Sequence, residues 1–459
     1  MKQKIVIALD ACPISMQLHN VSDYGGEQVF SKVALPLFVE SDCLGPKPLA
    51  ASKVEISNDH RVFDVTIRSD LKWSNGGVVT AHDYIYAFKS ICLERSSHYF
   101  NLLSDLEGYK EYSNGLSPML GVTAIGDYQI RFRLRNRNQF FLQYLTLLSL
   151  SPMNRERRDI HCGPYELISY SNDHIVLERN KYYQIDHRKN TADVIRFENY
   201  DKPRSHNEAL ERYDAGQLDI TCDTALTYEQ YHETQDTPSF QRIDLRLAML
   251  LAPGQLFRSI PNALRRQLHV IVNRQEMVQR LLQIPAEIRG YYELYSLKNE
   301  KQENNKKCTE KVDSFNLIVA YDEYYPNGIV VELLREQFSK FGVTVETRVD
   351  NYGMKNNQCH LRLELRKSLK TTPILLYKAD LLRGYLTPDE FHHAHQIYSV
   401  LLRGCSYERE VECYKQLDLI LSASAVSIPL LSIPGGAYCR EGIKRNSVWK
   451  VGHYVHFEK

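Results

Sequence analysis

The stretch that decides the fold is residues 67–83, which read IRSDLKWSNGGVVTAHD. A strand-like segment ends here, Asn75-Gly76 forms a turn, and a helical pattern then begins. Thr80 suits the N-cap, and Asp83 stands at the capping-box position in the first turn. Apolar residues recur at helical spacing after it, at positions 84, 85, 88, 91 and 92. We therefore predict a strand, a tight turn and an amphipathic helix, in that order.

The sequence on both sides of this stretch alternates between strand-like and helix-like patterns. Residues 62–68 and 128–134 alternate with a period of two, which is typical of half-buried strands. Residues 315–349 follow the order strand, helix, strand, which predicts a parallel strand pair. The chain is therefore predicted to be an α/β protein. Further predicted elements are strands at 5–9 and 175–177 and helices at 207–213 and 263–282.

Length and composition limit the class of protein. The chain has 459 residues, of which 43% are hydrophobic, so we expect two or three folding units with substantial cores. It carries 57 Lys+Arg against 56 Asp+Glu, which gives no general attraction to nucleic acid or acidic lipid. No apolar run approaches the ~18 residues of a membrane helix. The polar stretch at residues 298–311 predicts a surface loop or linker.

The N-terminus and the cysteines bear on the compartment. The apolar run at residues 5–9 stops at Asp10, short of a signal-peptide core, so a buried strand is the favoured interpretation. The ten cysteines form no C-x-x-C pair and no spacing typical of a zinc site or a disulfide framework. Scattered thiols of this kind are typical of a reducing compartment. The sequence therefore predicts a cytoplasmic protein.

Two segments resemble a known protein family. Residues 67–83 are similar to a signature of the family 5 extracellular solute-binding proteins, which are the peptide- and nickel-binding subunits of ABC importers. The second segment contains Cys162-Gly163-Pro164-Tyr165 and, at residues 176–183, VLERNKYY, which resemble a Gly-Pro-Tyr turn and a following strand of the same family. Weaker resemblances follow in the same order at residues 214–220, 264–275, 341–343 and 428–430.

The resemblance implies a two-lobed periplasmic-binding-protein-like fold, of type II and of the large peptide-binder class. Lobe one would consist of residues 1–245 and 416–459, with an extra subdomain inserted at about 56–155. Lobe two would consist of residues 246–415. Proteins with this architecture close on their ligand by a hinge motion between the lobes.

The resemblance also supplies a candidate ligand-binding residue, Asp380. Peptide-binding members of the family hold the ligand ammonium with an acidic residue of the second lobe, in an Ala-Asp-Tyr stretch. Here Ala379-Asp380 falls at that place, followed by Leu381 instead of tyrosine. A carboxylate facing an ammonium group forms a strong, charge-assisted hydrogen bond. The alternative interpretation is that Asp380 caps a turn or pairs with Arg383.

Three aromatic residues are further candidates for ligand contacts: Trp73, Tyr99 and Tyr165. Tyr99 follows the predicted helix of the first lobe, where relatives place aromatic residues that line the cleft. Trp73 and Tyr165 belong to the two family-like segments, and tyrosine combines a flat apolar ring with a polar tip. A plain packing role is the alternative for each of them.

Other clusters have simpler interpretations. His392, His393 and His395 lie on a predicted helix and could offer metal ligands, but no further sequence-local ligand completes a site. We therefore predict an exposed polar helix, no metal and no cofactor. Alternate arginines at residues 131–137 predict a solvated strand face rather than a nucleic-acid site. His161-Cys162 is interpreted as structural, since neighbouring residues on a strand point to opposite faces.

The function predicted from the sequence is ligand binding without catalysis. No catalytic motif, P-loop or dinucleotide fingerprint is present in the sequence. We expect a monomer that closes around a peptide or peptide-like small molecule and acts as an intracellular sensor or carrier. One alternative is an exported importer subunit that works with an ABC transporter permease and whose leader is absent from this sequence. Another is an enzyme, or a partner of a biosynthetic enzyme, built on the same fold.

Overall fold

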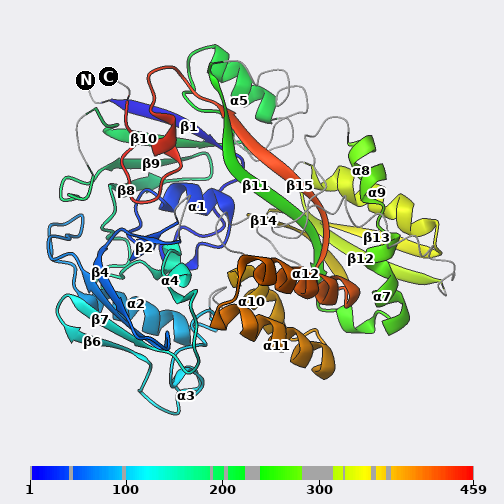
Figure 1. Cartoon of the computed structure of the whole chain (residues 1–459). Coiled ribbons are helices and arrows are strands. Elements are labelled where there is room, and N and C mark those ends of the chain that lie inside the picture. The colour runs from blue at the N-terminus through cyan, green and yellow to red at the C-terminus, as the bar shows by residue number, and fades with distance from the viewer. Residues whose placement is uncertain are drawn as a thin grey trace. The chain divides into compact units, whose positions relative to one another are not determined.

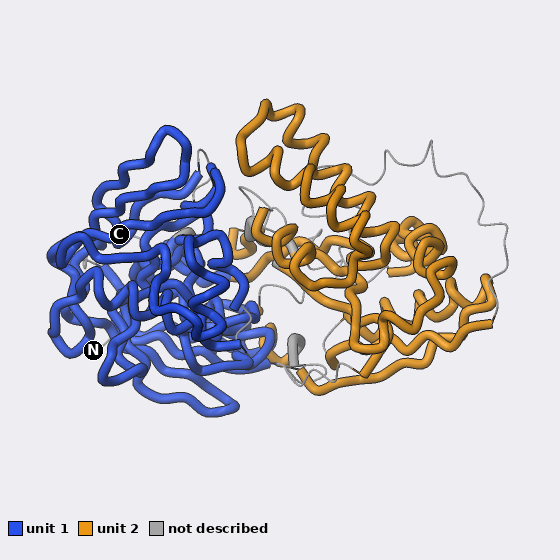
Figure 2. Tube along the Cα trace, turned by 90° about the horizontal axis from the view of Figure 1, so that it is seen from below, with its two compact units in different colours: residues 1–200, 211–221, 439–459 blue, residues 201–210, 222–438 orange. Residues whose placement is uncertain are grey.

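The computed structural model describes residues 3–40, 45–95, 100–186, 190–200, 205–222, 238–281, 314–323, 326–352, 358–367 and 374–457. The chain forms two compact units (Figure 2). Unit 1 consists of residues 1–200, 211–221 and 439–459, and unit 2 of residues 201–210 and 222–438. In the described part of the chain, no helix is both long enough and apolar enough to cross a membrane.

The described residues of unit 1 form two four-stranded sheets and a two-stranded one. The strands of the first sheet are, in spatial order, β1 (Lys4–Leu9), β10 (Val194–Asn199), β9 (His174–Arg179) and β8 (Tyr165–Tyr170). The second sheet contains β4 (Ala51–Ile56), β5 (Val62–Ile67), β7 (Gln129–Arg133) and β6 (Val122–Gly126), and β2 (Phe38–Val39) pairs with β3 (Lys47–Pro48). The helices are α1 (Tyr24–Phe30), α2 (Ala81–Leu93), α3 (Tyr109–Ser113), α4 (Phe141–Tyr144) and α13 (Arg445–Val448), with the 3-10 turns η1 (Leu18–Asn20) and η2 (Leu148–Leu150).

The strand, turn and helix predicted from residues 67–83 are confirmed. Helix α2 follows Thr80, whose backbone N–H donates to Asp83 Oδ2 at 2.8 Å, so the capping box is formed. The apolar face of α2 packs on the second sheet, where Phe88 meets Phe132 at a ring-centroid distance of 5.4 Å. The predicted strands at 62–68, 128–134, 5–9 and 175–177 are also present.

The described strands of unit 2 form one five-stranded sheet, in which β11 and β15 are the longest pair (Figure 1). The parallel pairing predicted within residues 315–349 is confirmed. The strands are, in spatial order, β13 (Val343–Asp350), β12 (Phe315–Asp322), β14 (Leu361–Lys367), β11 (Phe240–Pro253) and β15 (Ile428–Tyr438). The helices in the described part of this unit are α7 (Asn262–Ile271), α8 (Arg274–Arg280), α9 (Asn327–Ser339), α10 (Ile374–Leu382), α11 (Pro388–Arg403) and α12 (Tyr407–Ala423), with the 3-10 turn η3 (Phe257–Ser259). Helix α5 (Ser205–Asp214) contains residues of both units and covers the predicted helix at 207–213.

The prediction of a single helix for residues 263–282 is wrong, because the structure has two helices there, α7 and α8. Val272 adopts an extended conformation after two other β-branched residues, which fit a helix poorly. Asn273 then caps the new helix, since its side chain accepts a hydrogen bond from Glu276 N at 3.1 Å. A β-branched run followed by an asparagine cap is therefore a helix boundary here, not a mild interruption.

The unit boundaries lie at residues 200, 210, 221 and 438, whereas the lobes expected from the sequence end at 245 and 415. Strands β5, β6 and β7 and helix α2 fall within the expected inserted subdomain, whereas β4 largely precedes it, and all of them belong to unit 1. The hinge motion of the two lobes remains a prediction. The polar stretch at residues 298–311 lies outside the described residues.

Candidate functional site

Four charged side chains of unit 2, two in β14 and two next to it, contact one another. We call them the β14 cluster: Glu364, Arg366, Asp380 and Arg383. Arg366 donates hydrogen bonds to both acids, at 2.8 Å to Asp380 Oδ1 and at 2.8 Å to Glu364 Oε2. Arg383 Nη2 donates to the same Glu364 oxygen at 3.0 Å, and its Nε lies 3.4 Å from Asp380 Oδ1. Two carboxylates and two guanidinium groups therefore form one connected network.

The sequence of β14 explains where this cluster lies. Residues 361–367 read LRLELRK, so leucines alternate with charged residues. Successive side chains of a strand point to opposite faces, so Arg362, Glu364 and Arg366 share one face while the first two leucines enter the core. Helix α10 and the residue that follows it supply Asp380 and Arg383.

Arg362 holds a second group of charges at the carboxyl ends of β12 and β13. Asp322 and Asp350 are the last residues of these strands and are direct neighbours in the strand register. The Arg362 side chain is only 3% exposed; it donates to Asp322 Oδ1 at 2.5 Å and also to Asp350 Oδ2. The guanidinium therefore neutralises two carboxylates that would otherwise repel each other.

Both groups lie at a topological switch point of the sheet. From β12 the chain passes through α9 to β13 on one side, and it later adds β14 on the other side. In open α/β sheets, ligands bind outside the carboxyl ends of the strands at such a point. This part of unit 2 is therefore our candidate functional site.

The carboxylate of Glu364 is held in its charged form. Burial raises the pKa of this carboxyl, but the charges and hydrogen bonds of Arg366 and Arg383 outweigh burial and hold the pKa well below its usual range. Glu364 in turn raises the pKa of the Arg383 guanidinium, against the effect of burial. Glu364 and Arg383 are therefore both charged at neutral pH.

Asp380 lies in α10, and its side chain is fully buried. The ion pair with Arg383, which was the alternative interpretation of this residue, is present. Contact between Asp380 and a ligand stays a prediction. Sequence analysis missed Glu364 and Arg366, although the alternation of leucine and charge in β14 could have drawn attention to them.

In unit 1 the two family-like segments contact each other. Ser74 N donates to the carbonyl oxygen of His161 at 2.8 Å. Gly76 has a φ of 92°, and a Cβ on it would lie 3.0 Å from the ring of Tyr182. Gly163 is equally constrained, since a Cβ there would lie 2.5 Å from the Val33 carbonyl. These glycines permit close packing of segments that are distant in sequence.

Two of the predicted ligand residues lie in the interior of unit 1. Trp73 is 4% exposed. Tyr165 is fully buried; its hydroxyl donates to Ala192 O at 3.2 Å and accepts from Val455 N at 3.0 Å. Tyr99 lies outside the described residues. Contact of these three residues with a ligand stays a prediction.

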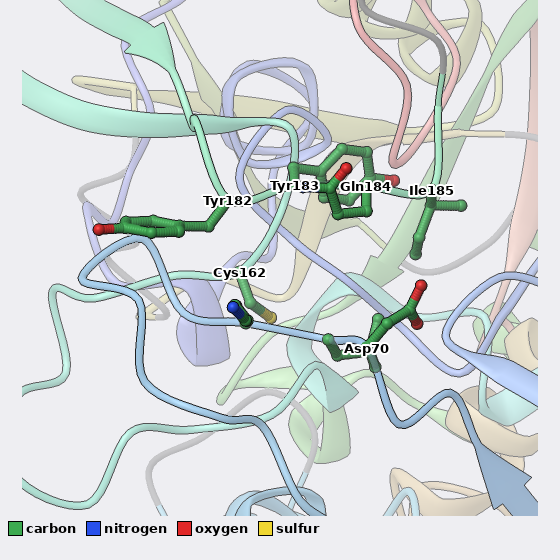
Figure 3. A pocket seen from close by; sticks show the side chains of 8 residues that line it. Asp70, Cys162, Tyr182, Tyr183, Gln184 and Ile185 are labelled. Carbon is green, nitrogen blue, oxygen red and sulfur yellow. The ribbon is translucent and has the colours of Figure 1, made fainter.

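A small pocket lies beside the family-like segments of unit 1, with Asp70, Cys162, Tyr182 and Tyr183 in its wall (Figure 3). It has room for about one water molecule, with an interior volume of about 10 Å³. Small-molecule sites are typically about 300–1,000 Å³ in volume. The pocket is therefore too small to enclose a peptide.

The C-terminal segment of unit 1 is anchored by charges that sequence analysis did not identify. Lys32 is 1% exposed, and its ammonium donates to the carbonyl oxygens of Ser447 at 3.0 Å and Lys450 at 2.9 Å. One oxygen of Asp186 accepts from His456 Nε2 at 2.9 Å and from the backbone N–H of Tyr454 at 3.1 Å. The partners are more than 260 residues apart in sequence, so no local pattern indicated these contacts.

The histidines on α11 and the arginines on β7 are exposed or half-buried, as the sequence predicted. His392, His393 and His395 are exposed. Within the described ranges, no group of three or more histidine, cysteine, aspartate or glutamate side chains could hold a metal ion. Arg131 pairs with Asp64 at 2.6 Å on the neighbouring strand.

Comparison with known proteins agrees with this architecture. The profile of the bacterial extracellular solute-binding proteins, family 5, matches residues 45–362. The two-lobed α/β fold of periplasmic binding proteins is the class to which the structure conforms. The chain belongs to the family 5 solute-binding proteins, and the resemblance stated from the sequence is confirmed.

Curated relatives match part of the chain. The oligopeptide-binding protein OppA of Bacillus subtilis is 27% identical over 193 residues, which are 38% of this chain and 34% of that protein. The periplasmic oligopeptide-binding protein OppA of Haemophilus influenzae is 29% identical over 255 residues, which are 51% of this chain and 46% of that protein. The matches therefore span a third to a half of these relatives.

Solved structures match the whole chain. The Haemophilus influenzae OppA in complex with the peptide RPPGFSPFR has a TM-score of 0.82 at 18% identity, covering 100% of this chain and 99% of the other. The Escherichia coli murein tripeptide binding protein MppA has a TM-score of 0.81 at 16% identity, with the same coverage. At this level of identity the likeness establishes the fold alone.

Proposed function

We propose that this protein binds a peptide or peptide-like small molecule and closes around it without chemical conversion. The observation that carries the proposal is family membership together with relatives, 27–29% identical, that are named oligopeptide-binding proteins. Closure would follow from contacts that the ligand makes only in the closed state, since a ligand shifts an equilibrium by its differential affinity.

Asp380 is the residue that we propose for contact with the ligand's amino group. Its carboxylate is oriented by Arg366, which donates to it at 2.8 Å from the neighbouring strand. An oriented, desolvated carboxylate binds an ammonium group more strongly than a solvated one, because water no longer competes for it. The site at the β12–β14 switch point supports this position for a ligand contact.

The first test is thermal unfolding with and without pools of short peptides. A ligand at 100 times its dissociation constant adds about 2.7 kcal/mol to the stability of the state that binds it. For a unit of 150–250 residues this corresponds to a rise of several degrees, about 2–4 °C for each kcal/mol. No rise with any pool would contradict peptide binding and direct the search to another ligand.

The residue-level test is Asp380→Asn. This change keeps the size of the side chain but removes its charge, so we expect peptides with a free amino terminus to bind about tenfold more weakly or worse. Asp389→Asn on the exposed start of α11 is the matched control and should bind as the wild type does. Equal affinities of both variants, measured by calorimetry, would remove Asp380 from the site.

The compartment and the partner form a separate proposal. Cys92, Cys162, Cys359, Cys405 and Cys413 are free thiols, which supports a reducing compartment and a role as intracellular sensor or carrier. The printed name of the Haemophilus influenzae relative, a periplasmic protein, supports the alternative of an exported subunit with an ABC transporter permease as partner. Thiol titration of protein isolated without reductant, together with cell fractionation, distinguishes the two.

A further inference from the structure

The two arginines of the β14 cluster hold Asp380 unequally. Arg366 makes a direct hydrogen bond to Asp380 Oδ1 at 2.8 Å. Arg383 approaches the same oxygen through Nε at 3.4 Å, an ion-pair contact, while its hydrogen bond goes to Glu364 at 3.0 Å. Arg383 can therefore leave Asp380 and still keep a charged partner.

The four side chains of the β14 cluster carry equal numbers of positive and negative charges. Glu364 and Asp380 carry two negative charges, and Arg366 and Arg383 carry two positive ones. A ligand ammonium at Asp380 would bring a third positive charge to this buried network. Because like charges repel strongly where water is scarce, the ammonium and the Arg383 guanidinium compete for the same carboxylate.

The position of Arg383 makes it, rather than Arg366, the residue that yields. Arg366 lies within β14 and hydrogen-bonds to both acids, so its displacement would break both contacts. Arg383 comes directly after the last residue of α10 and precedes Gly384, whose φ is 73°. It is also the more exposed of the two side chains, at 24% against 11%.

We infer that Arg383 competes with the ligand's amino group for Asp380. This competition weakens the binding of peptides with a free amino terminus and has little effect on peptides whose amino group is blocked. This inference rests on the proposed function, because it presumes that Asp380 meets the ligand. Arg383 is thus a specificity-determining residue. It neutralises the buried Asp380 when no ligand is present, and an incoming ammonium must displace it in order to bind.

The test compares the wild type with Arg383→Gln and Arg383→Lys. The probes are a pool of unmodified tri- to pentapeptides and the same pool with acetylated amino termini, and binding is measured by calorimetry. Loss of the competing charge in Arg383→Gln should strengthen binding of the unmodified pool about tenfold, with little change for the acetylated pool. Arg383→Lys keeps the charge and should gain much less.

The matched control is Arg403→Gln, an exposed arginine in the last turn of α11. It should bind both pools as the wild type does. Circular dichroism and the unfolding midpoint of each variant establish that it is folded, since Glu364 keeps Arg366 as a partner in Arg383→Gln.

Each outcome distinguishes the inference from the proposed function. If the wild type binds peptides and Arg383→Gln binds the unmodified pool no more tightly, the inference is overturned and peptide binding stands. Equal strengthening for both pools also overturns it, because the effect would not depend on the amino group. If only Arg383→Gln binds peptides, the result would support both the proposed function and the inference. Binding by neither protein overturns the proposed function and the inference with it.

Discussion

Buried charge is used differently in the two units. In unit 1, the ammonium of Lys32 bonds to backbone carbonyl oxygens of the C-terminal segment, at Ser447 and Lys450. In unit 2, the β14 cluster joins side chains to side chains. Backbone partners cannot rotate away, so the first arrangement fixes a segment in place. Paired side chains can exchange partners, which the proposed contact of Asp380 with a ligand would require.

The largest effect expected from this comparison is that of Arg362→Gln. Removal of the guanidinium leaves Asp322 and Asp350 side by side without their shared counter-charge. Breaking a buried ion pair in this way costs about 3–5 kcal/mol. Denaturant unfolding of the full chain, with hydrogen exchange of β12 and β13 as the local probe, measures the loss.

The matched control for this change is Arg335→Gln on α9. Arg335 is 56% exposed and pairs with Glu332 within the same helix. Exposed pairs contribute little, so its loss should change the free energy of unfolding by less than about 1 kcal/mol. Equal effects of the two substitutions would mean that Arg362 does not stabilise the carboxyl ends of β12 and β13.

A smaller effect is expected for Tyr165→Phe in unit 1. The change removes a buried hydroxyl that bonds to Ala192 and Val455, and should cost about 1–3 kcal/mol. Tyr170→Phe at the exposed end of β8 is the control, because Tyr170 is 61% exposed and should tolerate the change. If Tyr165→Phe instead weakens peptide binding while stability is unchanged, the structural role is wrong and the predicted ligand contact is supported.

The effect expected of Lys32 is a dependence of stability on pH. Burial is the main reason why the pKa of its ammonium is lowered from 10.5 to about 7. The charge of Asp186 raises this pKa, and the charge of Lys450 lowers it. Between these two values the unfolded chain binds more protons than the folded one, so stability rises with pH. The slope is at most about 1.4 kcal/mol per pH unit.

Lys32→Met should remove this contribution, so the stability difference between variant and wild type should change with pH from 7 to 10.5. Lys110→Met, at an exposed lysine of α3, is the control and should leave the pH dependence as it is. The measurement is urea unfolding at a series of pH values. A slope that survives in Lys32→Met would assign the pH dependence to other groups.

Most elements of the fold could be predicted from local sequence. The capped helix after Thr80 and the parallel pair within residues 315–349 depend on short-range patterns that the structure keeps. The break at Val272-Asn273 was misjudged, because an apolar helical periodicity continued across it while β-branching and a cap signal argued against it. Periodicity alone does not locate the end of a helix when another helix follows directly.

The site was predictable only in part. Asp380 was chosen as a candidate through a family resemblance, and its pairing with Arg383, three residues later, was the alternative interpretation. The link from Arg366 to Asp380 depends on how β14 and α10 pack, which no sequence pattern specifies. Lys32 gave even less indication, since a buried lysine looks like a surface lysine until its distant partners are known.

The last strand and the C-terminal segment determine when each unit can finish folding during synthesis. Strand β15 pairs along β11 in unit 2, and residues 444–457 supply Tyr454 and the anchoring carbonyls in unit 1. A chain emerging from the ribosome therefore exposes unfinished surfaces in both units until these residues are available. Chains that stall before residue 428 would leave the edge of β11 unpaired and prone to association with other chains.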